Sequence, residues 1–584
     1  MTDATKDNAV KAEAFYRNHK KDLLMIIWSL FVAAFMCFIL KTARMDYETS
    51  DDLFMMQLLM GVFGTFSAYN VFNNIVFSGL LSLLSTLIPG VNFCGWLYII
   101  FIFASYEVLG IVLIKRSEDR DPFYLLLPLL FMLATFDTLI VRFNYSKIGA
   151  VAFIVGFLTV MVSDNREGKK TVGNNILNIS GYILLIGGAL IRREPFMACL
   201  PFAIVMAAYM FIKNGKRFIP TIIRLSVSLA LIAVLWMVNH VIYHTGQLKD
   251  YSIYYDICLG SQDYYGLPDY ETYKEEYDML GLNEHDQAML ASYLQADRDV
   301  FSNEVLIRLD DLAKEINSDS HRLTPGFMKE LIRSVFKLGT QFPQIYVIMI
   351  LFCFSCAVGD RRHTYISFLG IALFFGELLY LTYEGRILER SILVSCIGAL
   401  AMIVFFLSEG IYENIDRRVA FNVVITSVLI YTVFTMGFSD IRDIPRYEIY
   451  KKADVSVLDA ELSKNTQNLY IWDFQSYADA SFGYASPVEG YPVNWMGNSV
   501  VLGAWPYKVK ALDRLVTPFG NPDNLFLILA ENPNAYFVYE KKNPMLGNLG
   551  PEVMKRYIND HYNPDAVPVI TFETDEYVVM SFSR

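Results

Sequence analysis

Two neighbouring carboxylates, Asp51 and Asp52, are the residues whose type and spacing best suit chemistry. They follow Asp46 and Glu48, so that four acids fall within seven residues, and they open an apolar, amphipathic stretch. A short helix that begins here would hold both carboxylates at its N-terminus. Such a pair could act as general base on an acceptor hydroxyl, position that acceptor or hold a metal ion. The structural alternative is that Ser50, Asp51 or Asp52 is only the N-cap of the helix, where a carboxylate complements the helix dipole.

Arginine side chains beside apolar runs are a second set with a chemical use. Arginine matches phosphate oxygens with paired N–H donors, so it suits a ligand that presents a phosphate group at the edge of a membrane. The candidates for this role are Arg386, Arg193, Arg192 and Arg44. The structural alternative is that these side chains reach toward lipid headgroups or pair with neighbouring acids such as Glu194.

The elements that must position these residues are membrane-spanning helices. Hydrophobic residues make up 54% of the 584 residues and charged residues only 19%, and the apolar residues gather in runs. Runs of about 17–22 residues have the length that a helix needs to cross ~30 Å of hydrocarbon. The sequence therefore predicts an α-helical polytopic membrane protein with about eleven transmembrane helices, at 22–41, 93–114, 122–141, 147–163, 172–191, 196–213, 218–243, 341–358, 363–383, 391–408 and 417–437.

The loops between these runs predict the orientation of the chain in a plasma membrane. A cytoplasmic N-terminus places every short basic loop inside, as the positive-inside rule requires. The apolar stretch 71–88 is interrupted by Asn and Ser residues, and it predicts a helix in the membrane interface; counting it as a span would move the basic loops outside. The predicted organisation is a cytoplasmic tail at 1–21, a transmembrane domain at 22–437 with outer loops 42–92 and 244–340, and an extracytoplasmic domain at 438–584.

The C-terminal segment 438–584 differs from the rest in composition, with more Pro, Asn, Asp and Gly. Short β-type runs predict strands at 468–472, 525–529, 535–539, 567–572 and 577–582, and helical spacing predicts helices at 455–463 and 551–561, which indicates a small α/β domain. The aromatic residues Tyr491, Trp495 and Trp505 would either bind a sugar or fill the core. The net charge of −11 argues against nucleic acid as a partner.

Three acids lie inside apolar runs, where a charge costs at least ~2.5–3.5 kcal/mol and usually faces a cavity or a partner. Asp137 is near the outer end of its predicted span, and with Glu194 it is a candidate for lining a cleft. Glu107 and Glu377 would instead mark a proton or ion path, which is the feature that favours a transporter. The structural alternative for both is a protonated, hydrogen-bonded acid.

The first outer loop resembles that of the GT-C class of membrane glycosyltransferases, which includes protein mannosyltransferases, lipid A aminoarabinose transferases and oligosaccharyltransferases. The likeness rests on the pair Asp51-Asp52, the following interfacial stretch 71–88 with Pro89-Gly90, and the span after it. It implies that Asp51 and Asp52 carry out base chemistry, with Asp46 as a second candidate. Many members carry a His-Pro-Pro-type motif ahead of the interfacial helix, and this chain has none there.

The GT-C resemblance implies an inverting enzyme that moves a sugar from a polyprenyl-phosphate-linked donor to an extracytoplasmic acceptor, which is a cell-surface glycan, a lipid or a protein. It specifies no cofactor, although a divalent metal ion would suit the acidic cluster. Two other functions stay open, a transporter or flippase for lipid-linked glycans and a non-catalytic cell-envelope assembly protein. The segment 264–286 resembles one that recurs in multi-span membrane proteins of Gram-positive bacteria, which implies a bacterial source and no chemistry.

Overall fold

The computed structural model describes residues 3–42, 45–116, 125–163, 172–320, 324–359, 361–409, 415–436, 447–482, 486–492, 495–543 and 550–583. The chain forms two compact units, and each is described by itself. Unit 1 contains Met1–Met45, Leu97–Val234 and Glu330–Asp443. Unit 2 contains Asp46–Trp96, Leu235–Lys329 and Ile444–Arg584.

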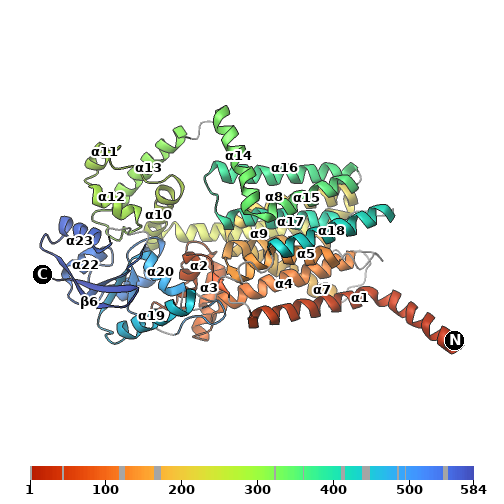
Figure 1. Cartoon of the computed structure of the whole chain (residues 1–584), viewed down its shortest axis with the longest axis horizontal. Coiled ribbons are helices and arrows are strands. Elements are labelled where there is room, and N and C mark those ends of the chain that lie inside the picture. Colours follow the sequence, from red (N-terminus) through yellow and green to blue (C-terminus); the bar gives the residue numbers. More distant parts are fainter. Residues whose placement is uncertain are drawn as a thin grey trace. The chain divides into compact units, whose positions relative to one another are not determined.

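Unit 1 is built from long apolar helices (Figure 1). They are α1 (Asp3–Thr42), α4 (Phe93–Arg116), α5 (Leu126–Phe136) continued by the π-helical turn η2 (Asp137–Val141), α6 (Tyr145–Val162), α7 (Val172–Ile191), α8 (Arg193–Asn214), α9 (Ile219–Tyr243), α14 (Pro325–Gln341), α15 (Pro343–Val358), α16 (Arg361–Tyr383), α17 (Glu389–Glu409) and α18 (Ile415–Thr435). The first residues of α4 and α14 and the last residues of α9 belong to unit 2.

Among the described residues, each of the eleven predicted spans overlaps an apolar helix; residues 122–124 and 437 of the predicted spans lie outside them. Seven helical segments among the described residues are long and apolar enough to cross a bilayer, or eight if α14 and α15 form one span; one of the seven, Arg193–Tyr243, contains both α8 and α9. Three apolar helices are shorter: Ile75–Leu87, Leu126–Val141 and Val419–Thr435. The predicted helical membrane protein is therefore confirmed, whereas the number of crossings stays a prediction.

The centre of unit 1 is formed by helices that approach each other closely. The backbones of α6 and α7 meet at small residues: a Cβ atom on Gly156 would lie 2.2 Å from the Leu185 nitrogen, and one on Gly188 would lie 2.4 Å from the Phe153 nitrogen. Glycine allows this approach, which is the usual way for apolar helices to pack where the surroundings are also apolar. Both α6 and α17 are buried almost all round as a result.

Polar contacts between helix ends test whether the predicted spans alternate in direction. At one end, Glu409 of α17 forms ion pairs with Arg116 of α4 and with Lys213 of α8, the latter at 2.6 Å. The predicted spans place Arg116 and Lys213 on the cytoplasmic side, and Glu409 directly follows the span 391–408, which ends on that side. At the other end, Arg192 donates to Ser146 Oγ at 2.9 Å, and both were predicted to lie outside. The contacts thus support the alternation of the spans, although they do not show which side faces the cytoplasm.

Unit 2 combines the segments after α1 and α9 with the end of the chain. Its helices are α2 (Ser50–Met60), α3 (Ile75–Leu87), α10 (Lys249–Cys258), α11 (Lys274–Met279), α12 (Glu284–Ala291), α13 (Asn303–Ser320), α19 (Tyr447–Leu462), α20 (Phe474–Phe482), α21 (Lys510–Val516), α22 (Leu525–Glu531) and α23 (Gly550–His561). The short strand β1 (Asp46–Tyr47) precedes α2, and the 3-10 turn η7 (Trp505–Lys508) precedes α21.

A five-stranded sheet near the end of the chain confirms the predicted C-terminal α/β domain. The strands are β3 (Leu469–Trp472), β4 (Ser499–Val501), β5 (Ala535–Glu540), β6 (Val567–Glu573) and β7 (Tyr577–Ser583), in the order β4-β3-β5-β7-β6. Strand β3 pairs in parallel with both β4 and β5, whereas β7 is antiparallel to β5 and β6.

One predicted strand in this domain is wrong, because 525–529 lies in helix α22. The run Leu525–Glu531 is almost entirely apolar, and periodicity alone cannot separate a buried strand from a buried helix in such a run. The residue before it decides the outcome. Asn524 is the N-cap, and its side-chain oxygen accepts from the Leu527 backbone N–H at 2.9 Å.

Helix α3 matches the predicted interfacial stretch. Asn74 caps it by accepting from the Val76 backbone N–H, and Asn239 of α9 accepts from the Ile75 backbone N–H at 2.7 Å. One face, with Phe77 and Leu81, is buried, while large side chains on the opposite face are exposed: Val76, Leu80, Leu83, Leu87 and Ile88. Its 13 residues are too few to cross ~30 Å of hydrocarbon, which agrees with a helix that lies in the interface.

Candidate functional site

Helix α2 carries the predicted catalytic pair in its first turn. Thr49 is its N-cap, in an extended conformation, and Gly61 ends it in the left-handed region with φ 72°. Asp51 and Asp52 are therefore inside the helix, where their charges complement the N-terminal end of the helix dipole. The alternative that Ser50, Asp51 or Asp52 is the N-cap was wrong by position, because the cap lies one residue earlier.

Each aspartate of the pair accepts a hydrogen bond from a neutral donor. The indole Nε1 of Trp505 donates to Asp51 Oδ1 at 2.9 Å, and the hydroxyl of Thr49 donates to Asp52 Oδ2 at 2.7 Å. Asp52 is only 3% exposed, whereas Asp51 is half-buried. The two carboxylates thus differ in their access to a substrate.

The third predicted acid, Asp46, lies in β1 beside Tyr47. The Tyr47 hydroxyl accepts from Asn92 Nδ2 at 2.9 Å. Burial raises the pKa of Tyr47, the nearby Cys94 raises it further, the hydrogen bond from Asn92 opposes this, and the charges of Asp52 and Asp46 also raise it. Because both carboxylates act on this one phenol, the fold brings Asp46 and Asp52 into the same neighbourhood.

An aromatic cluster attaches α2 to the C-terminal domain. The Phe54 ring centroid lies 5.3 Å from those of Phe474 and Tyr477 and 6.1 Å from that of Trp505. Gln57 Nε2 adds a hydrogen bond to Ser481 Oγ at 3.2 Å. Trp505 is buried, as are Tyr491 and Trp495, so these three aromatic residues fill the core, which was one of the two predicted roles.

Helix α2 covers the carboxyl ends of the parallel strands, where an α/β domain usually binds its ligand. In the order β4-β3-β5, the chain adds β4 on one side of β3 and then β5 on its other side. Ligands of open parallel sheets bind beyond the carboxyl ends of the strands at such a topological switch point. Phe474 follows β3 and Trp505 follows β4, and both pack against Phe54. Side chains of α2 therefore fill this position, and the C-terminal domain holds the helix that carries the aspartates.

The backbone that carries Trp505 is strained. Ala504 has φ 51° and ψ −167°, a conformation that residues other than glycine rarely adopt. Its N–H donates to the Tyr293 carbonyl at 3.2 Å, and its own carbonyl accepts from the Tyr254 hydroxyl at 3.2 Å. Residues of the segment 244–329 thus hold Ala504 in place, and with it the indole that donates to Asp51.

The predicted phosphate ligands that the structure describes belong to unit 1. Arg192 donates to Glu194 at 2.9 Å, to Ser146 and to the Tyr145 hydroxyl. Arg193 pairs with Glu194 at 3.4 Å and is 64% exposed. Arg386 lies between α16 and α17, and its backbone N–H donates to the Leu381 carbonyl at 2.8 Å. The fourth, Arg44, lies outside the described residues.

The other predicted polar positions are also in unit 1. Asp137 is buried where α5 passes into the π-helical turn η2. Glu194 pairs with both Arg192 and Arg193, which fits the predicted alternative of pairing with neighbouring arginines. Because the aspartates lie in unit 2 and the arginines in unit 1, the predicted combination of base and phosphate ligands stays a prediction.

The acids that favoured a transporter have hydrogen-bond partners on neighbouring helices. Ser29 of α1 donates to one carboxylate oxygen of Glu107, and Glu377 of α16 bonds with Ser395 of α17. These contacts agree with the structural alternative for both acids. Among the described residues, no three His, Cys, Asp or Glu side chains are grouped so that they could hold a metal ion.

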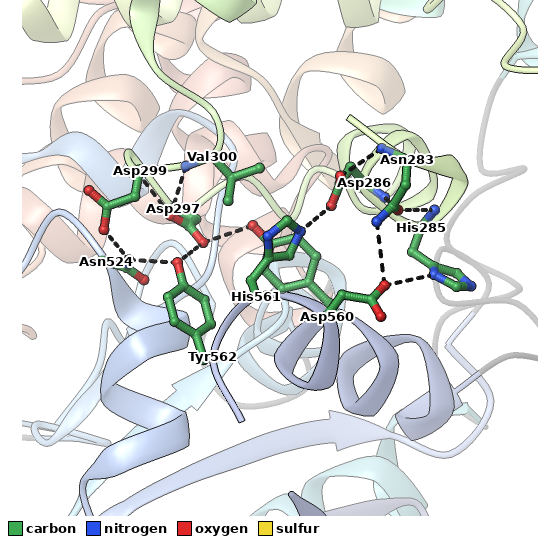
Figure 2. Close-up of polar contacts among 11 residues, drawn as sticks. Asn283, His285, Asp286, Asp297, Asp299, Val300, Asn524, Asp560, His561 and Tyr562 are labelled. Carbon is green, nitrogen blue, oxygen red and sulfur yellow. Dashed lines mark hydrogen bonds and ion pairs between the residues drawn. The ribbon is translucent and has the colours of Figure 1, made fainter. Parts of the chain in front are cut away.

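A group of polar residues that the sequence did not indicate joins the segment 244–329 to the C-terminal domain (Figure 2). We call it the polar latch; it consists of Asp286, Asp297, Asn524, His561 and Tyr562. His561 Nε2 and Asp286 Oδ1 are 2.8 Å apart, and Asn524 Nδ2 donates to the Tyr562 hydroxyl at 2.7 Å. Its partners are separated by up to 275 residues, so no local pattern in the sequence could have revealed it.

Asp297 is the centre of the latch. It is fully buried and accepts from the backbone N–H groups of Asp299 and Val300, from the Tyr557 hydroxyl at 2.8 Å and from the Tyr562 hydroxyl. A buried carboxylate needs such donors, because burial without them is costly. The loop that contains Asp297 is thereby held against α22 and α23, and this same segment supports Ala504.

The latch should make the docking of α23 depend on pH. The hydrogen bond to Asp286 raises the pKa of His561 above its usual value, burial opposes this, and the charges of Asp286, Asp297 and Asp560 add to the increase. A raised folded-state pKa means that the stabilisation is fully present below about pH 6.5 and is lost as the pH rises through the folded-state pKa. Asp286 is fully buried, but the His561 side chain is 20% exposed to solvent, so we expect roughly 0.5–1 kcal/mol, measured by hydrogen exchange of the α23 amides in the full chain.

The matched variant for this measurement is His561→Gln, which keeps a side-chain donor for Asp286 but does not titrate. His285 and the other charges near α23 remain in it. Its α23 amides should show less change in protection between pH 6 and pH 8.5, after correction for intrinsic exchange rates. An identical pH dependence in both proteins would show that His561 has no part in it.

No protein-family model matches the chain, and no curated protein matches it. The chain is similar to crystal structures of ArnT from Cupriavidus metallidurans. The structure in the apo state has 10% identity and a TM-score of 0.40, with 96% of this chain and 97% of that chain covered. The structure bound to undecaprenyl phosphate has the same identity and TM-score, with 95% and 98% covered. Similarity at this level establishes neither a family nor an activity.

Proposed function

We propose that this chain is a membrane glycosyltransferase that moves a sugar from a polyprenyl-phosphate-linked donor to an acceptor hydroxyl outside the membrane. The observation that carries the proposal is the pair Asp51 and Asp52 in the first turn of α2, held by Trp505 and Thr49. A carboxylate in a defined position is suited to take a proton from a hydroxyl nucleophile. The apolar face of α3, which follows in the chain, is suited to the lipid boundary where such a donor resides.

The proposed reaction is a single displacement at the anomeric carbon of the sugar. The acceptor hydroxyl gives its proton to Asp51, and its oxygen forms a bond to the anomeric carbon. The bond from that carbon to the phosphate oxygen breaks, and polyprenyl phosphate leaves. Asp51 is proposed as the base because it is only half-buried, so an acceptor can reach its carboxylate. Asp52 is almost inaccessible and is proposed to assist as the neighbouring acid.

The leaving phosphate needs cationic partners. Arg193 and Arg386 are proposed for this role. Arg193 is 64% exposed and pairs with Glu194 only at the surface, whereas Arg192 is held by Glu194, Ser146 and Tyr145 together. A guanidinium group can bind two phosphate oxygens at once and stabilise the charge that develops on them. Asp137 and Glu194 are proposed to line the cleft that would receive the donor phosphate.

The experiment is a transfer assay with the purified full chain in lipid nanodiscs. The probes are polyprenyl-phosphate-linked glucose, mannose and galactose, each with a labelled sugar, together with bacterial cell-wall glycan as acceptor. We expect labelled acceptor and an equal amount of free polyprenyl phosphate. If sealed vesicles instead show movement of the intact lipid-linked sugar across the bilayer with no release of polyprenyl phosphate, the chain is a transporter and the proposal fails.

Trp505 is proposed as a positioning residue for Asp51. Trp505→Phe keeps an aromatic ring against Phe54 but removes the N–H donor. A hydrogen bond to a charged group contributes about 1.5–3 kcal/mol, so kcat/KM for transfer should fall at least about ten-fold, with an altered pH profile. The control is Trp472→Phe, which removes an indole hydrogen bond to Ser499 inside the sheet. Equal losses of kcat/KM in both variants, with unchanged pH profiles, would show that Trp505 only packs against its neighbours and does not position Asp51.

A further inference from the structure

Helix α14 has three distinct faces. It runs from Pro325 to Gln341 and meets α15 at a bend of 101°. If α15 crosses the membrane, a helix bent by this angle lies along the membrane surface. The chain therefore changes direction where water and lipid meet.

The faces of α14 follow from the four-residue spacing of its side chains. Leu331, Val335 and Leu338 are buried. Met328, Ile332 and Phe336 form a second stripe of large apolar side chains, and this stripe is exposed, with Phe336 at 69%. Lys329, Arg333 and Lys337 form an exposed basic stripe on its other side. Successive helix residues are turned by about 100°, so the exposed apolar stripe lies between the buried stripe and the basic one.

We propose that α14 lies in the membrane interface and binds anionic lipid headgroups with its basic stripe. Met328, Ile332 and Phe336 would enter the boundary between headgroups and acyl chains, and Lys329, Arg333 and Lys337 would reach the lipid phosphates beside them. This arrangement of apolar and basic faces is typical of helices that lie on membranes. The proposal is independent of the glycosyl-transfer reaction and of Asp51 and Asp52.

Charge on this face favours an anionic lipid surface over the same face of a second copy as the occupant. The stripe holds three basic residues and no acid, so two copies that met through this face would repel each other. The nearest acid on the helix is Glu330, whose carboxylate is 3.9 Å from Arg333 in a pair that is more than half exposed on both sides. An exposed pair of this kind is weak, so Arg333 retains its ability to bind a phosphate.

The test uses the full chain in vesicles of equal parts phosphatidylcholine and phosphatidylglycerol. Phe336 is replaced by the photo-crosslinking amino acid p-benzoylphenylalanine, and adducts are identified by mass spectrometry. The control position is Val457, which is exposed on α19 of the C-terminal domain. Lipid adducts are expected at 336 and not at 457. No lipid adduct at 336, or a cross-link to a second copy of the chain, would overturn the proposal.

The headgroup preference is tested in the same vesicles. Phosphatidylglycerol adducts at 336 should exceed phosphatidylcholine adducts at least about five-fold, because one basic residue near an anionic surface contributes ~1 kcal/mol. The variant K329Q/R333Q/K337Q should bring the two adducts close to equal amounts. The variant K464Q/K542Q/K555Q removes three charges from the C-terminal domain and should leave the preference unchanged. Equal adducts without any substitution, or equal effects of both triple variants, would contradict binding by the basic stripe.

Discussion

Replacing both Asp51 and Asp52 with asparagine is expected to lower the rate of sugar transfer at least about 10³-fold while the chain stays folded. A positioned general base contributes roughly 10²- to 10⁴-fold, and an amide cannot take the proton. The fold should persist because an asparagine oxygen can still accept from Trp505 at position 51 and from Thr49 at position 52. The measurement is the single-turnover rate in nanodiscs with donor and acceptor at saturation, beside a thermal unfolding curve.

A matched pair of acids in the same unit provides the control. Glu275 and Glu276 are neighbours in the first turn of a short helix, α11, as Asp51 and Asp52 are in α2. Changing both to glutamine removes the same charge from a similar position. We expect a change in transfer rate of less than about two-fold. If sugar transfer survives in the Asp51→Asn/Asp52→Asn protein, the chain is still a transferase but Asp51 and Asp52 are not its catalytic base.

The second large effect is expected in stability, from Asp297→Ala in the polar latch. This change leaves two tyrosine hydroxyls and two backbone N–H groups without the carboxylate that accepts from them. A buried donor without an acceptor costs about 1–3 kcal/mol. Three of these four hydrogen bonds are only part-buried, so the low end applies and the free energy of unfolding of unit 2 should fall by roughly 4 kcal/mol. Hydrogen exchange of β5 and β7 in the full chain measures this loss.

Asp560 serves as the comparison for Asp297. Its carboxylate pairs with His285 at 3.1 Å, but both side chains are about one-third exposed. Asp560→Ala should therefore cost no more than about 1 kcal/mol. Similar losses for the two alanine variants would show that burial of Asp297 is not what makes the latch stabilising.

The membrane helices were predictable because a long apolar run can adopt few structures in lipid. A chain inside a bilayer must satisfy its backbone hydrogen bonds internally, so each run of sufficient length becomes a helix. The ion pairs of Glu409 with Arg116 and Lys213 were not predicted, since they join residues of three helices far apart in the chain. The predicted strand at 525–529 was wrong because its apolar pattern fits both a helix and a strand, and only the N-cap at Asn524 identifies the helix.

The candidate site was predictable only in its local part. The acids Asp51 and Asp52 begin a helix, as their spacing indicated, although Thr49 provides the cap. Their donors could not be found in the same way: Trp505 is 454 residues from Asp51, and the segment that supports its backbone is a third region of the chain. Nothing in local spacing encodes a contact over that distance. The arginines remain predicted phosphate ligands because a guanidinium group matches phosphate oxygens.

The aromatic cluster around Phe54 has a consequence for how the chain matures. Phe54 leaves the ribosome early, but its partners Phe474, Tyr477 and Trp505 are made more than 400 residues later. Until the end of the chain has been made and has folded, Phe54 of α2 lacks these three partners, and a polypeptide truncated after α18 would never acquire them. The packing of α2 is therefore completed only in a chain that has been synthesised to its end.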